Sequence, residues 1–219
     1  MSRPSENAVA AALSPFERGA EIIFGILMAI SVTAAAEITL GAEVNVRELM
    51  LAALGCNLAW GLIDAVIYLL QLQFERHRVH RMVLELRELE SEDAFRARVA
   101  AEVPPLVAQA MTPDSYSHIR RAVQSYAQAR PAYWSRRELE AAGLICLLVF
   151  GSTFPLVLPF ILMQAPWLAL RISHGIAVVM LFILGWKLGR WSGASAFGSG
   201  ALLAAVGVVL AVLCVALGG

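Results

Sequence analysis

Charged residues are scarce in this chain. They make up 16% of its 219 residues, whereas about a quarter of the residues in a typical soluble domain are charged. Hydrophobic residues make up 59%, and they fall in blocks of roughly 20, the length that crosses a bilayer as a helix. The composition therefore argues against a soluble globular domain and predicts an all-α, polytopic membrane protein.

The apolar blocks predict five transmembrane helices. They lie near residues 20–40, 49–71, 141–163, 172–190 and 198–217. The chain then divides into an N-terminal arm with two spans (1–71), a polar insert (72–140) and three further spans (141–219). In the insert we expect three helices, over 72–103, from there to about Met111, and from Thr112 up to Arg130-Pro131, because Pro104-Pro105 ends the first and Thr112-Pro113 begins the last.

Cysteine is rare as well, and its placement excludes several classes of site. Cys56, Cys146 and Cys214 all lie in apolar blocks, without the spacing of a metal site or a disulfide framework. The chain lacks a nucleophile elbow, a zinc-protease helix and a phosphate-binding loop, so we expect no enzyme. Its arginines are interleaved with equal numbers of acids, which gives no support to nucleic-acid binding.

The basic residues predict the topology. Nearly all of them fall in the N-terminal arm, in 72–140 and in 187–197, which lie on one side of a five-span protein. The positive-inside rule makes that side cytoplasmic, with the C-terminus outside. A single lysine beside many alanines and arginines is typical of a GC-rich bacterial genome, which implies the inner membrane.

Sequence signals mark where two of the spans begin and where one of them bends. Ser14-Pro15-Phe16-Glu17 and Ser135-Arg136-Arg137-Glu138 have the pattern of capping boxes, so both helices should begin before the membrane. The third span contains Pro155 and Pro159, which should free backbone carbonyls and bend the helix.

A carboxylate lies in the middle of the second apolar span. Asp64 falls in the second block, on one helical face with Asn57, Tyr68 and Gln71 at spacings of i, i+7, i+11 and i+14. A carboxylate at bilayer depth is costly without a partner, water or a cation. A polar stripe on such a helix must face protein or an aqueous path, so the pattern predicts a membrane transporter.

Three segments, in order, resemble the vacuolar iron transporter family. Arg18-Gly19-Ala20-Glu21-Ile22-Ile23-Phe24-Gly25 is similar to the opening of the family's first span, and Pro155-Leu156-Val157-Leu158-Pro159-Phe160 to its third-span double proline. Gly185-Trp186-Lys187-Leu188-Gly189-Arg190, with Gly193 and Ser195, resembles its loop between spans four and five. The resemblance implies five spans, a cytoplasmic helical insert, a homodimer, and export of Fe²⁺ or Mn²⁺ from the cytoplasm in exchange for protons.

The chain departs from the family at two ligand positions. Where the family has an aspartate in the first span this chain has Met28, and where it has a carboxylate in the second span this chain has Gly61, with Asp64 three residues further on. The chain thus resembles a divergent member with rearranged metal ligands, and no tightly bound cofactor is expected.

Helix geometry places two candidate ligands at similar depth. At about 1.5 Å per residue, Met28 lies roughly 12 Å and Asp64 roughly 10 Å from the cytoplasmic ends of their spans, with Glu21 two turns below Met28. A thioether beside a carboxylate would suit a borderline cation such as Fe²⁺, although Met28 also reads as a gap-filling side chain. Asn57 is either a ligand or an interhelical hydrogen-bonding group, and Glu37 is either an exit-side site or a solvated helix end.

The polar insert carries its own candidate acids. Glu85, Glu88 and Glu92 share one face of the expected 72–103 helix, and in the family an acidic face here gathers metal ions. The alternative is an exposed helix with Glu–Arg pairs such as Arg81 with Glu85. His77 and His80 lack a placed third ligand for a metal.

The sequence therefore predicts two alternative functions. The first is a proton-coupled transporter of Fe²⁺ or Mn²⁺ that works in the lipid bilayer as a homodimer. The second is a transport-inactive scaffold or metal-responsive interaction protein of the same fold. This alternative is suggested by Met28, which stands where the family has its first-span aspartate.

Overall fold

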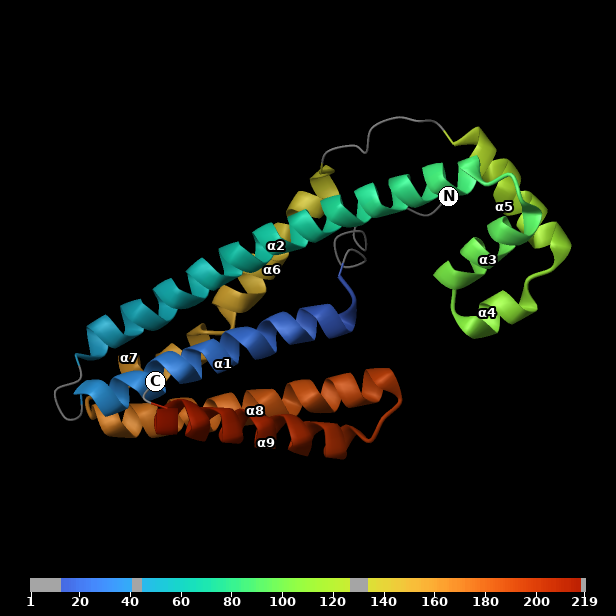
Figure 1. Cartoon of the computed structure of the whole chain (residues 1–219). Coiled ribbons are helices and arrows are strands. Elements are labelled where there is room, and N and C mark those ends of the chain that lie inside the picture. The colour runs from blue at the N-terminus through green and yellow to red at the C-terminus, as the bar shows by residue number, and fades with distance from the viewer. Residues whose placement is uncertain (1–12, 41–44, 127–133, 218–219) are drawn as a thin grey trace, which may run out of the picture. The chain divides into compact units, whose positions relative to one another are not determined.

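The chain is built from helices. The computed structural model describes residues 13–40, 45–126 and 134–217, without the side chains of 36–40, 214, 215 and 217. Every regular element in these ranges is an α-helix (Figure 1): α1 (Pro15–Leu40), α2 (Val46–Glu88), α3 (Glu92–Glu102), α4 (Pro105–Ala110), α5 (Pro113–Ser125), α6 (Arg136–Gly151), α7 (Phe154–Leu162), α8 (Pro166–Ser192) and α9 (Ala196–Leu217).

Five helical segments within the described ranges are long and apolar enough to cross a membrane. They are α1, α2, α6 together with α7, α8 and α9, and they coincide with the five apolar blocks. Many of their large apolar side chains are exposed, for example Leu62 on α2 and Leu202 on α9. Exposed apolar area on this scale is normal only where lipid or another protein covers it.

Both expected capping boxes are confirmed. At the start of α1 the Ser14 N–H donates to Glu17 Oε2 (2.6 Å), and the Glu17 N–H donates back to Ser14 Oγ (3.2 Å). At the start of α6 the Ser135 N–H donates to Glu138 Oε2 (2.7 Å), and the Glu138 N–H donates to Ser135 Oγ. Each box satisfies backbone N–H groups that a helix start leaves without partners.

The third apolar span is broken rather than merely bent. α6 ends at Gly151 and α7 begins at Phe154. Pro155 has no N–H to donate to the Gly151 carbonyl, and the chain tightens here, since the Thr153 N–H donates to the Phe150 carbonyl three residues back. The side chains of Ser152 and Thr153 at the break are buried, whereas Gly151 and Phe154 on either side of them are exposed.

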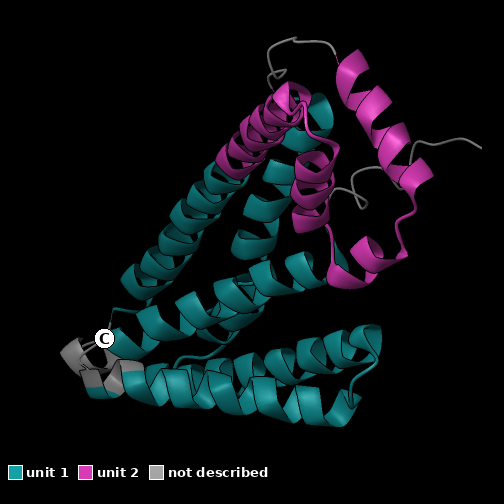
Figure 2. Ribbon diagram, turned by 45° about the vertical axis from the view of Figure 1, so that its right-hand side comes forward, with its two compact units in different colours: residues 1–68, 135–219 teal, residues 69–134 magenta. Residues whose placement is uncertain are grey.

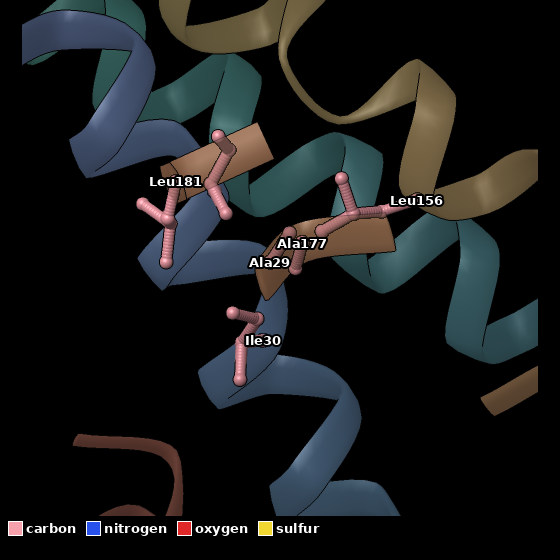
Figure 3. Packing of buried hydrophobic residues seen from close by; sticks show 6 residues of the cluster. Ala29, Ile30, Leu156, Ala177 and Leu181 are labelled. Atoms are coloured by element: carbon pink, nitrogen blue, oxygen red, sulfur yellow. The ribbon is translucent and has the colours of Figure 1, made fainter. Parts of the chain in front are cut away.

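The chain forms two compact units, and α2 contributes to both. Unit 1 comprises residues 1–68 and 135–219, and unit 2 comprises 69–134 (Figure 2). In unit 1, α8 and α9 run side by side (Figure 1). The core of unit 1 lies between α1, α7 and α8, where Ile26, Ile30, Leu156, Ala177 and Leu181 are buried together (Figure 3).

Unit 2 differs from the expected insert at its first turn. α2 ends at Glu88 and α3 begins at Glu92, capped by Ser91, whose Oγ accepts from the Ala94 N–H. A single helix over 72–103 is therefore wrong, because Ser91 followed by two acids starts a new helix. Pro104-Pro105 separates α3 from α4, and Thr112 caps α5, as expected. Phe95 is the centre of a core that joins Leu86, Val99, Tyr116 and Val123.

Candidate functional site

Asp64 lies on the face of α2 that turns toward the protein. Along the polar stripe, Asn57 and Gly61 are buried and Asp64 and Tyr68 are half-buried, while Leu58 and Leu62 between them are exposed. The Oδ2 atom of Asp64 is inaccessible to solvent and has no hydrogen-bond partner among the described residues. Such a carboxylate oxygen is an available acceptor for a proton, a water or a cation.

A second carboxylate, Glu21 on α1, lies near Asp64. Glu21 is half-buried, and it is close enough to Asp64 and to Glu17 for their charges to interact. Tyr68 is within electrostatic reach of Glu17 and of Glu138 on α6. No arginine, lysine or histidine of the described ranges forms an ion pair with Glu21 or Asp64. Several negative charges thus gather where α1, α2 and α6 meet, and no cation of the described residues neutralises Glu21 or Asp64.

The register between α1 and α2 decides which residues share a level. The Asn57 Nδ2–H donates to the Gly25 carbonyl (2.8 Å), and the Phe24 and Trp60 rings meet edge to face, with centroids 5.7 Å apart. Because the two helices run in opposite directions, these contacts bring Glu21 to within one to three residue steps of the level of Asp64, about 1.5–4.5 Å along the axis, while Met28 lies on the far side of Gly25. Ten residue steps in all, at about 1.5 Å each, put Met28 roughly 15 Å along the axis from Asp64.

The expected pairing of Met28 with Asp64 is therefore wrong, and Glu21 takes the place expected for Met28. Depth counted from the ends of the spans misplaces Met28, because contacts in the middle of α1 and α2 set the register. Gly25 also permits the close approach of α6 to α1, since a Cβ there would lie 2.2 Å from Ser152 Oγ and 2.5 Å from the Val149 carbonyl oxygen. Met28 itself is half-buried.

Asn57 forms interhelical hydrogen bonds and also has an oxygen that could act as a metal ligand. Its side chain is fully buried, and Nδ2 bridges the Gly25 carbonyl on α1 and Thr153 Oγ1 (2.5 Å) at the start of α7. These bonds connect α1, α2 and α7, as Asn side chains do between membrane helices. Its Oδ1 has no hydrogen-bond partner in the described structure, so one acceptor remains available. Glu37, the other intramembrane acid, lies in α1, but its side chain is outside the described residues.

Several acids of unit 2 are engaged with arginines, whereas Glu88 is exposed and forms no ion pair with another described residue. Glu85 pairs with Arg81 (4.0 Å) and Arg98 (3.6 Å), and Glu92 pairs with Arg96 (3.3 Å). Glu92 also pairs with Arg120. Since α2 ends at Glu88, Glu85 and Glu88 lie on one helix and Glu92 on the next, so the expected single face of three glutamates is wrong.

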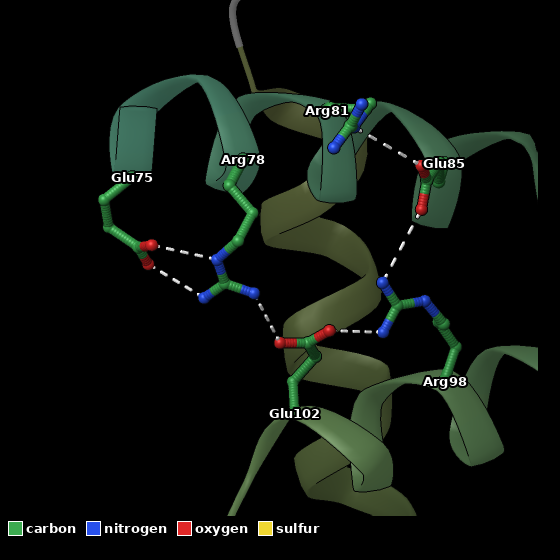
Figure 4. A network of polar contacts seen from close by, with 6 residues as sticks. All are labelled: Glu75, Arg78, Arg81, Glu85, Arg98 and Glu102. Carbon is green, nitrogen blue, oxygen red and sulfur yellow. Dashed lines mark hydrogen bonds and ion pairs between the residues drawn. The ribbon is translucent and has the colours of Figure 1, made fainter. Parts of the chain in front are cut away.

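An ion-pair network links the end of α2 to α3 (Figure 4). Arg78 donates to Glu75 (2.8 Å) and to Glu102 (3.1 Å), and Arg98 joins Glu102 to Glu85. Hydrogen bonds from Arg98, and then from Arg78, hold the pKa of Glu102 below its ordinary value, while the pKa of Arg78 is raised by its bonds to Glu75 and Glu102. These carboxylates already have cationic partners, which makes them poor metal ligands.

The histidines of unit 2 do not complete a metal site. His77 Nδ1 lies 2.7 Å from the Gln73 carbonyl, and His80 Nδ1 lies 3.4 Å from the Tyr126 hydroxyl. Nowhere in the described ranges do three His, Cys, Asp or Glu side chains come together as ligands. The Glu21–Asp64 pair therefore supplies two carboxylates, and any further ligand would come from water, hydroxyl or carbonyl oxygens.

Sequence reasoning missed a polar contact in the other half of the span bundle. Thr33 on α1 is buried, and its Oγ1 lies 3.1 Å from Nε2 of His174 on α8. Ser173 beside it is fully buried, with an unpaired Oγ. Thr33, Ser173 and His174 are polar residues inside apolar blocks. Their positions could have indicated the contact, since such residues usually face the interior of a bundle.

Comparison of the chain with protein-family models and with curated proteins found no match in either.

Proposed function

We propose that this protein is a proton-coupled transporter of divalent transition-metal cations, Fe²⁺ or Mn²⁺, out of the cytoplasm. The observation that carries the proposal is the pairing of Glu21 with Asp64 across two apolar helices. Two carboxylates without a protein cation, one of them with a buried unpaired oxygen, form a site that a divalent cation or a proton would neutralise.

The ligand chemistry favours a cation that accepts oxygen. Carboxylate and water oxygens suit Mn²⁺ and high-spin Fe²⁺, whereas a site of thiolates would favour zinc or copper. The unpaired Oδ1 of Asn57 and the thioether of Met28 lie further along α2 and α1. A cation that leaves Asp64 would meet these groups next, an amide oxygen first and a soft sulfur after it.

Proton coupling follows from the charge balance at the same pair. With both carboxylates ionised the site holds two negative charges, which match one divalent cation. Protonation of Asp64 and Glu21 removes those charges, so that a proton and a cation compete for the same oxygens. Competition of this kind is the minimum requirement for exchange of one against the other.

We also propose a membrane topology and a family for the chain. The N-terminus and residues 72–140 would be cytoplasmic and the C-terminus outside, in the inner membrane of a bacterium, with the chain a divergent, homodimeric member of the vacuolar iron transporter family. The arrangement is supported by basic residues on one side of five apolar helices. The helices α3, α4 and α5 would then form a cytoplasmic insert.

The ion pairs of unit 2 support the alternative function. Its acids Glu85, Glu92 and Glu102 are neutralised by arginines, so this unit is built as a folded ionic cluster and not as an open acidic surface. A transport-inactive scaffold that binds partners through such a unit is the alternative. It predicts a folded protein that moves no cation.

Transport into liposomes separates the two functions. Purified protein would be reconstituted and Mn²⁺ entry followed with an internal dye, with and without a proton gradient, and with empty liposomes as the control. We expect Mn²⁺ flux that the proton gradient accelerates and that empty liposomes do not show. Absence of flux for Mn²⁺ and Fe²⁺, with helical content unchanged after reconstitution, would contradict transport and favour the scaffold.

A further inference from the structure

An open groove lies on α2 directly after the second apolar block. The described residues that line it lie between Gln71 and Arg81, among them Phe74 and Arg78, and its volume is about 880 Å³. All of them belong to unit 2. The groove is therefore separate from the Glu21–Asp64 pair and is a feature of unit 2 alone.

One face of α2 changes from apolar to cationic at this groove. Ile67, Leu70, Phe74, Arg78 and Arg81 follow one another at three- or four-residue spacing, so they lie on the same side of the helix. The three apolar side chains are exposed, and so are the two arginines that follow them. An exposed apolar stripe that leads to cations matches the order of groups in a phospholipid, in which acyl chains are followed by a phosphate.

Trp134 marks the level of the membrane interface beside the groove. Its Nε1–H donates to the Leu69 carbonyl (3.0 Å), and its ring is exposed. Trp side chains favour the membrane–water interface, because the ring is apolar and the N–H is polar. The apolar block also ends here, since Gln71 is its first polar residue after Tyr68. The hydrocarbon layer therefore ends near Leu69 to Gln71, immediately before the arginines.

The guanidinium of Arg78 lies at the depth of phospholipid headgroups. Arg78 is seven residues beyond Gln71, roughly 10 Å along the axis. Its side chain turns back to Glu75, three residues earlier, at 2.8 Å, which brings the charge about 4.5 Å nearer the apolar block. The remaining distance of roughly 6 Å matches the polar layer on each side of a bilayer, which is roughly 5–7 Å thick.

The groove has an excess of positive charge. Among the described residues that line it, Glu75 is the acid, and Arg78 and Arg81 are the arginines. Arg78 uses three of its N–H groups, two for Glu75 and one for Glu102 (Figure 4), and a guanidinium has five. The ion pair of Arg81 with Glu85 is long at 4.0 Å, and the Arg81 side chain is 77% exposed. Both arginines can therefore donate to a phosphate.

From these observations we infer that the groove between Gln71 and Arg81 binds an anionic phospholipid of the adjacent leaflet. The phosphate lies between Arg78 and Arg81, and an acyl chain follows the exposed stripe back along Phe74 and Leu70. The excess positive charge selects an anionic headgroup over a zwitterionic one, whose ammonium group the arginines would repel. The inference requires a membrane protein but no transport, so it is independent of the proposed function.

Native mass spectrometry of the full-length protein in detergent micelles tests the site, with phosphatidylglycerol and phosphatidylcholine of the same acyl chains as probes. We expect the parent to bind phosphatidylglycerol more tightly than phosphatidylcholine. Arg81→Gln should lower the affinity for phosphatidylglycerol about fivefold, which corresponds to about 1 kcal/mol for one basic residue at a membrane surface. Arg81→Lys, which keeps the charge, should retain binding. Arg121→Gln, which removes the same charge from an exposed position of α5, is the matched control and should bind like the parent.

Two results would overturn the inference. Equal affinities of the parent for the two lipids would exclude selection of an anionic headgroup, and equal losses in Arg81→Gln and Arg121→Gln would show attraction by net charge without a site. Excess glycerol 3-phosphate separates a lipid from a soluble phosphate. We expect it to leave phosphatidylglycerol bound, because the acyl chain contacts Phe74 and Leu70, whereas displacement would assign the groove to soluble phosphates and refute a lipid site.

Discussion

Replacing Gly25 by alanine tests how closely α1 approaches α6. The added Cβ would lie 2.5 Å from the Val149 carbonyl oxygen and 3.1 Å from the Val149 Cα. Ser152 Oγ could rotate away, but these two atoms belong to the backbone of α6, so the helices must separate. The same shift would stretch the bond from Asn57 to the Gly25 carbonyl.

The magnitude follows from a matched comparison. Gly55→Ala adds the same methyl group within α2, where no atom lies within 4 Å, so both variants gain the same helix propensity, roughly 0.5–1 kcal/mol. The difference between them isolates the steric cost, which we expect to be about 1–3 kcal/mol in the free energy of unfolding.

The assay is unfolding of the purified protein in mixed micelles by increasing mole fractions of SDS, followed by circular dichroism. Gly55→Ala should be at least as stable as the parent, and Gly25→Ala less stable than Gly55→Ala by the amount given. Equal stability of the two variants would refute the close approach of α1 and α6.

Two further predictions concern the polar contacts of each unit. Asn57→Leu removes the bonds to Gly25 and Thr153. We expect it to lower the free energy of unfolding in the same assay by about 0.6–1.7 kcal/mol. An unchanged value would show that the hydrogen bonds of Asn57 do not stabilise the protein. Because its pKa is lowered from the ordinary 4.5, ionised Glu102 stabilises unit 2 above that pH and ceases to do so as pH falls through the lowered value. Hydrogen exchange of α3, corrected for intrinsic rates, should therefore accelerate below about pH 4.5 in the parent and less so in Glu102→Gln, and equal acceleration in both would contradict the ion-pair network.

Hydropathy was sufficient for the membrane helices. Five blocks of roughly 20 apolar residues predicted the five long helices because a bilayer constrains length and composition together. The starts of α1 and α6 were also predictable, since a capping box is a local interaction between residues three apart. The break between α6 and α7 was expected only as a bend, because Pro155 shows that a bond is lost without showing how neighbouring helices accommodate the loss.

The site was harder to predict because it depends on register. Asp64 was visible as a carboxylate in the middle of an apolar block, but its neighbour on α1 was set by the bond from Asn57 to the Gly25 carbonyl and by the contact of Phe24 with Trp60, which no residue spacing encodes. The end of α2 was missed for a different reason. Leu89, Glu90 and Ser91 contain no proline or glycine, and only the N-cap pattern at Ser91 marked the new helix.

The measurement that tests most directly whether Asp64 binds the transported cation is Mn²⁺ flux into proteoliposomes that contain Asp64→Asn. Asp93→Asn, an equivalent change at an exposed residue in the first turn of α3, is the control. We predict that Asp64→Asn folds and reconstitutes like the parent but passes no more Mn²⁺ than empty liposomes, while Asp93→Asn retains the parent flux. Parent-like flux in Asp64→Asn would contradict a cation path through the Glu21–Asp64 pair.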